Sequence, residues 1–113
     1  MLCILILACK PLRGKVKVIH LREMRFEWDP KKAKANLEKH GVSFAEAATV
    51  FGDPFAIFEP EPLHLERGIL IGTSEAQRLL FVVHVEIIEA DLIRIISARK
   101  ADRKERRRYE DED

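Results

Sequence analysis

The pattern of hydrophobic and polar positions divides the chain into short segments of strand and helix type. Continuous apolar runs of strand length end at turn-forming residues, which is typical of buried strands. These runs, with one short alternating segment, predict strands at residues 25–28, 55–58, 68–72, 79–85 and 92–98. The polar stretch between the third and fourth of these segments predicts a hairpin.

A first helix is predicted at residues 30–40. Asp29 suits the N-cap, Pro30 suits the first helical position, and Gly41 can adopt the left-handed conformation that ends a helix. Leu37 is expected to face inward, one turn after an alanine.

Capping boxes predict two further helices. In each box, a short polar side chain accepts from the amide three residues later, and a glutamate there reaches back. Ser43 and Glu46 form the first box, and the helix that follows is expected to end near residues 52–54. Asp102 and Glu105 form the second box, which predicts a C-terminal helix.

Helices and strands are segregated along the chain, which indicates an α+β fold. We expect a small, mostly antiparallel sheet with two N-terminal helices and one C-terminal helix. Residues 24–113 are expected to form the domain. Residues 1–23 are expected to be an N-terminal extension, which either lies upstream of a native start at Met24 or adds an edge strand where residues 15–18 alternate.

The composition is that of an ordinary folded protein, with 47% hydrophobic and 35% charged residues. No apolar run approaches the roughly 20 residues that a membrane helix requires. The two cysteines, Cys3 and Cys9, lie near the N-terminus, so no disulfide can hold the rest of the chain. We therefore expect a cytoplasmic protein that does not associate with membranes.

Charge is distributed unevenly along the chain. The formal net charge is only +1, but basic residues are concentrated at residues 99–108, and residues 110–113 are all acidic. A basic run suggests nucleic-acid binding, and the alternative is a solvated helix face. A chain of 113 residues has little room for an enclosed site, so any chemistry is expected on an open face.

Several motifs, read together, resemble one known family. They are FEWD at residues 26–29, KHGVSF at 39–44, IRIISAR at 93–99 and ERRRYE at 105–110. The chain resembles the BrnT family of ribonuclease toxins from residue 24 to about residue 110. The turn between residues 84 and 93 is about two residues longer than is usual in the family, and the N-terminal extension is foreign to its pattern.

The resemblance implies a RelE-like fold and a metal-independent endoribonuclease that cleaves RNA and thereby inhibits translation. No cofactor and no metal are implied. The implied partner is a BrnA-like ribbon-helix-helix antitoxin. Toxin and antitoxin would form a heterotetramer that binds DNA through the antitoxin.

Cleavage of RNA without a metal requires a proton acceptor, a proton donor and charge stabilisation at the phosphate. The side chains on or near the predicted sheet that could supply these functions, and the aromatic residue of the last helix, are the catalytic candidates. They are His84, Arg94, Arg99, Glu66 and Tyr109.

Structural roles remain open for several of these candidates. His84 could be a core histidine, since it lies within an apolar run. Arg94 interrupts an apolar strand and could pair with Glu86 or Glu66 rather than with a phosphate. Strict alternation along that strand places Arg94 and Ser97 on opposite faces. Tyr109 could stack on a base or could anchor the last helix.

Other basic residues are candidates for contacts with the RNA backbone. Arg67 and Arg78 lie at the ends of the predicted hairpin, and the first helix ends at His40, which could equally be a cap. In the last helix, three arginines spaced three and four apart form a possible RNA-binding stripe. The stripe consists of Arg103, Arg106 and Arg107.

Two other functions are compatible with the sequence. One is a catalytically inactive nucleic-acid-binding corepressor that acts with a ribbon-helix-helix antitoxin. The other is a structural partner without nucleic-acid contact. Cleavage activity separates the toxin from both, and salt-dependent affinity separates the corepressor from the structural partner.

Overall fold

The computed structural model describes residues 17–21 and 24–111 of the chain. Cys3 and Cys9 lie outside the described residues. The elements are β1 (Lys17–Leu21), β2 (Met24–Trp28), α2 (Pro30–His40), α3 (Phe44–Thr49), η1 (Val50–Gly52), β3 (Ile57–Pro60), β4 (Gly68–Thr73), β5 (Leu79–Ile87), η2 (Ile88–Ala90), β6 (Leu92–Lys100) and α4 (Arg103–Asp111). Every predicted strand and helix is present, although β3 begins two residues later than predicted.

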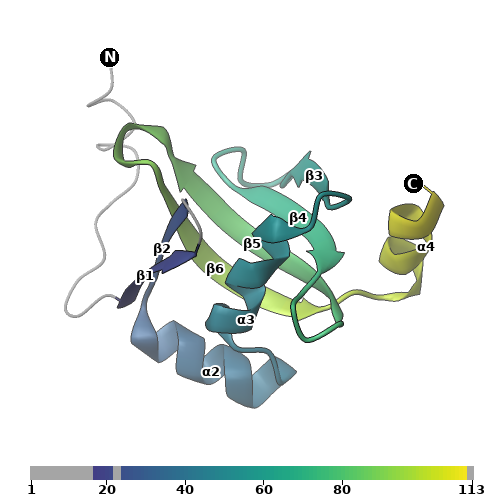
Figure 1. The fold of residues 1–113 in the computed structure, drawn as a ribbon, viewed down its shortest axis with the longest axis horizontal. Coiled ribbons are helices and arrows are strands. Elements are labelled where there is room, and N and C mark those ends of the chain that lie inside the picture. The colour runs from purple at the N-terminus through teal and green to yellow at the C-terminus, as the bar shows by residue number, and fades with distance from the viewer. Residues whose placement is uncertain (1–16, 22–23, 112–113) are drawn as a thin grey trace.

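The strands form one sheet in the order β1-β2-β6-β5-β4-β3. All neighbouring strands are antiparallel except β2 and β6, which are parallel, so the sheet is mixed. The helices α2 and α3 lie along one face of the sheet, and α4 lies at the far end of the molecule (Figure 1). This arrangement confirms the predicted α+β class. The domain boundary predicted at Met24 stays a prediction. Strand β1, which precedes it, pairs with β2 at the edge of the sheet.

Two apolar clusters occupy the two faces of the sheet. The larger cluster packs β2, β5 and β6 against α3, with Phe26, Phe44 and Leu80 almost fully buried. The smaller cluster lies on the opposite face, where Ile71 of β4 and Tyr109 of α4 belong to it. The second cluster is what holds the C-terminal helix against the sheet. In the described part of the chain, no helix is long and apolar enough to cross a membrane.

The inward face of α2 differs from the prediction. Leu37 is 49% exposed, whereas Asn36 is buried. The Asn36 side-chain amide donates to the carbonyl oxygens of Val42 (3.0 Å) and Ala98 (2.8 Å) and accepts from the Ala98 amide (3.2 Å). The prediction was wrong because this part of the helix meets the backbone of β6, which an amide satisfies and a leucine does not.

The two capping boxes have different outcomes. At the start of α4, the Glu105 amide donates to Asp102 and the Asp102 amide donates to Glu105, both at 2.8 Å, which confirms that box. At α3, Ser43 accepts from the Glu46 amide at 3.0 Å. The Glu46 carboxylate, however, does not return to Ser43 and instead binds side chains of the β4–β5 hairpin, so that half of the prediction was wrong.

A bulge changes which residues of β6 share a face. Val85 lies opposite Arg94 and Val83 lies opposite Ser97, with one extra residue on β6 between them. Val83 and Val85 are two positions apart and share a face, so Arg94 and Ser97 share it too. The expectation of opposite faces was therefore wrong, because strict alternation does not account for the extra residue. Arg99, opposite Phe81, also lies on this face.

Candidate functional site

The predicted site residues fall into three separate places. One group lies where the tip of the β4–β5 hairpin approaches α4, a second lies beside β3, and the third is Arg94 at the β2–β6 pairing. Each place has its own electrostatics.

A cleft of about 350 Å³ separates the hairpin tip from α4. We call it the α4 cleft, and its volume is within the range of ordinary ligand sites. It is lined by Thr73, Gln77, Arg78, Leu79, Lys100, Ala101, Arg106, Tyr109 and Glu110. Three predicted site residues, Arg78, Arg106 and Tyr109, are thus brought together, and Lys100 joins them although it was not predicted.

The hydroxyl of Tyr109 is held by two groups at one side of the cleft. It donates to Oδ2 of Asp53 at 2.7 Å and accepts from the Thr73 hydroxyl at 3.2 Å. Asp53 also accepts from the backbone amides of Thr73 (2.8 Å) and Phe55 (2.9 Å). Burial alone would raise the pKa of Asp53, but these hydrogen bonds outweigh it and hold the pKa below its usual value. Asp53 is therefore an ionised acceptor that orients Tyr109.

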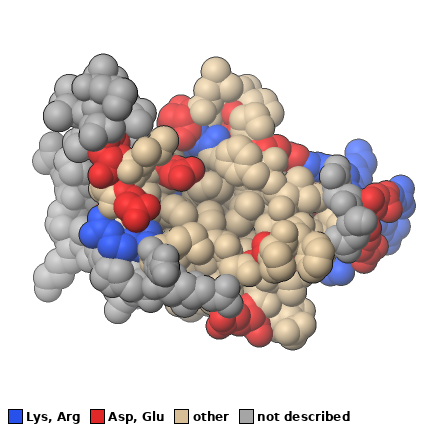
Figure 2. All heavy atoms as spheres, turned by 45° about the horizontal axis from the view of Figure 1, so that its top comes forward, with Lys and Arg blue, Asp and Glu red and all other residues tan. Residues whose placement is uncertain are grey.

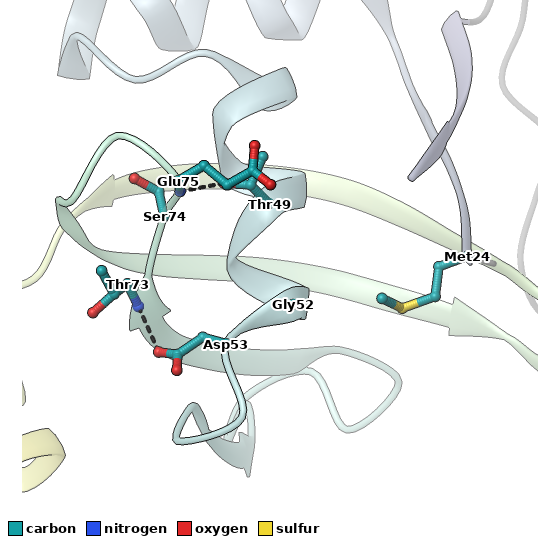
Figure 3. Close-up of a pocket in the computed structure, with 7 residues that line it drawn as sticks. All are labelled: Met24, Thr49, Gly52, Asp53, Thr73, Ser74 and Glu75. Carbon is teal, nitrogen blue, oxygen red and sulfur yellow. Dashed lines mark hydrogen bonds between the residues drawn. The ribbon is translucent and has the colours of Figure 1, made fainter. Parts of the chain in front are cut away.

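Asp53 also belongs to a neighbouring small pocket. Figure 3 shows Asp53 with Thr49, Gly52, Thr73, Ser74 and Glu75 around this pocket, and the bond from the Thr73 amide is drawn. The pocket contains two acids and no basic residue, so it does not suit a phosphate. Gly72 allows the turn after η1 to approach β4 closely, because a Cβ at this position would lie only 3.0 Å from Asp53 Oδ2.

Arg78 is fixed at the wall of the α4 cleft by Glu46. Its Nε lies 2.9 Å from Glu46 Oε2, a second nitrogen contacts Oε1, and it donates to the Gly41 carbonyl at 3.1 Å. The hydrogen bond from Arg78 is the main reason that the pKa of Glu46 is lowered. Arg78 therefore joins the hairpin tip to the end of α2, next to His40. Most of its guanidinium N–H donors are engaged by Glu46 and Gly41, which leaves few for a phosphate.

Arg99 lies on the α4 side of the sheet, one residue before Lys100. It makes two parallel hydrogen bonds to Glu105, of 2.9 and 2.8 Å, and its guanidinium lies 3.9 Å above the ring of Phe81. The hydrogen bonds that Arg99 donates to Glu105 raise the pKa of Arg99. This pair fixes the start of α4 to the end of β6.

The arginines of α4 differ in their surroundings. Arg103, Arg106 and Arg107 are all exposed, but only Arg106 lines the cleft. Arg108 pairs with Glu59 of β3. Among the described residues, neither Lys100 nor Arg106 has an ion-pair partner, so both are available to an anion in the cleft. Figure 2 shows Lys and Arg gathered at the end of the molecule that carries α4.

His84 lies in a second place, a pocket beside β3, with Glu66 and Arg67. It is only 4% exposed, and its ring packs against Phe51 and Phe58, with centroid distances of 4.9 and 6.0 Å. Burial lowers the pKa of His84 to about 4, so the imidazole is neutral at pH 7. Its buried Nδ1 has no hydrogen-bond partner in the described part of the chain.

Arg94 forms a nearly buried ion pair with Glu27. The parallel register of β2 and β6 places these two residues directly opposite each other. The predicted alternatives, Glu86 and Glu66, were the wrong partners, because the sequence does not reveal which strand lies beside β6. This pair lies on the opposite face from the ring of His84, which packs against η1.

The α4 cleft and the His84 pocket are too far apart to act on one phosphate. The α4 cleft is lined by Thr73 and the His84 pocket by Gly68, at the two ends of β4. At a rise of roughly 3.3 Å per residue, these ends are about 17 Å apart. The predicted catalytic residues therefore do not form one constellation. No three His, Cys, Asp or Glu side chains gather as a possible metal site within the described residues.

Comparison with known proteins identifies the family. Residues 28–105 match the sequence model described as the ribonuclease toxin, BrnT, of type II toxin–antitoxin systems. The chain belongs to the BrnT family. Its fold is similar to the 1.1 Å crystal structure of the Brucella abortus ribonuclease toxin BrnT, with a TM-score of 0.55 and 24% identity over 67% of this chain and 94% of that one. No curated protein matches this chain significantly.

Membership of the BrnT family accounts for the general character of the protein, a ribonuclease toxin of a type II system with an antitoxin partner. The matched region ends within α4, so three of the nine residues that line the cleft, Arg106, Tyr109 and Glu110, lie beyond it. Sequence reasoning missed Lys100 and Asp53. Lys100 had a weak signal, as part of the basic run, but nothing local indicated that Asp53 contacts Tyr109.

Proposed function

We propose that this BrnT-family protein is an endoribonuclease that binds RNA in the α4 cleft and cleaves it without a metal. The 2′-hydroxyl attacks the adjacent phosphorus, and the bond from phosphorus to the 5′-oxygen breaks. The products are a 2′,3′-cyclic phosphate and a 5′-hydroxyl. The observation that carries the proposal is the pair of available cations, Lys100 and Arg106, beside Tyr109 in one open cleft.

The cations bind the phosphate and stabilise the charge that builds up on its oxygens in the transition state. Tyr109 supplies a hydroxyl in the same cleft. As its own proton is directed toward Asp53, its oxygen can accept the proton of the attacking 2′-hydroxyl while Asp53 takes the phenolic proton. Water in the open cleft supplies the proton that turns the departing 5′-oxygen into the 5′-hydroxyl. The Tyr109 ring also offers a surface for a base. Arg99 and Arg78 shape the cleft through their ion pairs.

The predicted catalytic roles of His84, Glu66 and Arg94 receive less support. His84 and Glu66 line the pocket at the Gly68 end of β4, about 17 Å along the strand from its Thr73 end, where the Tyr109 hydroxyl is held. Arg94 is engaged with Glu27. We assign these residues no part in cleavage at the α4 cleft.

In the cell, we propose that RNA cleavage inhibits translation and that the toxin acts in the cytoplasm. A BrnA-like ribbon-helix-helix antitoxin would neutralise it and form a heterotetramer that binds DNA through the antitoxin. Support for this part comes from family membership.

The test is cleavage of a 5′-labelled RNA by the full chain, in the presence of EDTA. We expect fragments that end in a 2′,3′-cyclic phosphate, and Arg106→Ala is expected to slow cleavage more than Arg103→Ala does. Cleavage that disappears with EDTA contradicts metal independence. Salt-dependent RNA binding without any cleavage would instead support the inactive corepressor.

A further inference from the structure

Exposed apolar side chains gather beside β3, at the edge of the sheet. Phe58 is 61% exposed, and Leu63 and Leu65 of the following loop are 86% and 81% exposed. We call these three residues, with Pro60, the β3 patch. Single exposed apolar residues are ordinary, but a group on an edge strand is typical of an interaction surface. Figure 1 shows β3 at the end of the sheet opposite β1.

The β3 patch borders the His84 pocket. Phe58, Pro60 and Leu65 line this cavity of about 180 Å³, and His84 lies within it. An engineered cavity of roughly 150 Å³ holds a benzene molecule, so this one has room for a single side chain.

The charges around the pocket indicate what enters it. Glu66 and Glu86 line the pocket with one cation, Arg67, and Glu61 lies in the adjoining loop. Such a rim repels the phosphates of RNA, whereas the cations of the α4 cleft attract them. The same rim attracts a polypeptide that carries lysine or arginine beside apolar side chains.

We propose that the β3 patch is the surface on which the antitoxin docks. One apolar side chain of the antitoxin enters the pocket between Phe58 and Leu65, beside the ring of His84. Lysine or arginine side chains of the antitoxin face Glu66 and Glu86. This proposal rests on the proposed function for the existence of that partner, and it separates the antitoxin surface from the RNA cleft.

The position of β3 explains how docking there could block the enzyme. Glu59 of β3 pairs with Arg108 of α4, on the face of β3 opposite to Phe58. A partner that also wraps around the free edge of β3 meets Arg108, on the helix that carries Arg106 and Tyr109. Neutralisation then requires no contact with the reacting groups.

The test is binding of the full-chain toxin to the antitoxin of its type II system, measured by calorimetry. Leu65→Glu and, separately, Leu63→Glu are expected to weaken binding by at least about 30-fold, since each places an acid in an apolar contact. Ile88→Glu is the matched control, because Ile88 is 63% exposed but lies in η2, outside the patch. It is expected to bind as the unmodified chain does.

A second readout separates this proposal from the ribonuclease assignment. Both leucine variants are expected to cleave RNA at the unmodified rate and to resist inhibition by the antitoxin. Unchanged antitoxin affinity of both variants, with native circular dichroism, overturns the docking proposal. Weakened RNA binding in both variants overturns it also, since the patch would then serve RNA. Absence of cleavage by the unmodified chain contradicts the proposed function but leaves the affinity comparison valid.

Discussion

The phenolic oxygen of Tyr109 lies 2.7 Å from Oδ2 of Asp53, although the two residues are 56 positions apart in the chain. This contact joins α4 to the turn that follows η1, across the end of β4. It gives an exposed cleft one polar side chain with a fixed orientation.

Tyr109→Phe is expected to reduce the rate constant of RNA cleavage by roughly 10²-fold or more, the usual size of a lost acid–base contribution. The ring still packs on the sheet, so the free energy of unfolding should fall by only about 1 kcal/mol. Single-turnover cleavage and thermal unfolding measure the two effects. Thr73→Val, which removes the other hydrogen bond to the Tyr109 hydroxyl, is the control and should slow cleavage much less. Equal rates for Tyr109→Phe and the unmodified chain would show that Tyr109 only anchors α4.

Removal of a cation from the α4 cleft is expected to change how RNA affinity depends on salt. Each phosphate contact to single-stranded RNA contributes roughly 0.7 to the slope of log affinity against log salt concentration. Lys100→Ala and Arg106→Ala should therefore each lower the magnitude of that slope by about this amount. Arg103→Ala provides the comparison, because Arg103 is exposed on the same helix outside the cleft. Equal slopes for all variants would show that RNA binds elsewhere.

Arg94→Ala is expected to destabilise the fold by about 3 kcal/mol, because it leaves the carboxylate of Glu27 buried without its cation. Replacement of both residues by leucine should recover most of that loss. Chemical denaturation measures the free energies. The rate of cleavage per folded molecule should stay the same in both variants. Loss of cleavage by the fully folded variant with two leucines would restore Arg94 as a catalytic candidate.

Stability is expected to fall in acid because of His84. Its pKa is about 4 in the folded protein and 6.5 in a freely solvated histidine, so the unfolded chain binds the proton more tightly. The contribution is fully present above pH 6.5 and is lost as the pH falls toward 4, a difference of about 3 kcal/mol. Unfolding free energies across that range measure it. His84→Leu should flatten this part of the curve, and an unchanged slope would mean that His84 is not buried as a neutral ring.

Much of the architecture was predictable because it depends on neighbours in the chain. Asp29, Ser43 and Asp102 each accept from an amide two or three residues later, so helix starts can be read locally. Apolar runs likewise indicated each strand. The error at Leu37 arose where a helix position contacts backbone far along the chain, which no local pattern encodes.

The candidate site was predictable only in its residue types. The basic run and the final aromatic residue pointed to the C-terminal helix, and Arg106 and Tyr109 do line the α4 cleft. Grouping them with His84 was not justified, because the two places lie at opposite ends of β4.

The sequence by itself determined the elements, their order, the α+β class and the BrnT family. Only the tertiary structure decided which charges are paired and which are available. Glu27 meets Arg94 because β2 runs parallel to β6, and a single extra residue in β6 places Arg94 and Ser97 on one face. Strand order and register are set by the packing of the whole sheet, and therefore the location of the available cations is a property of the fold rather than of any segment.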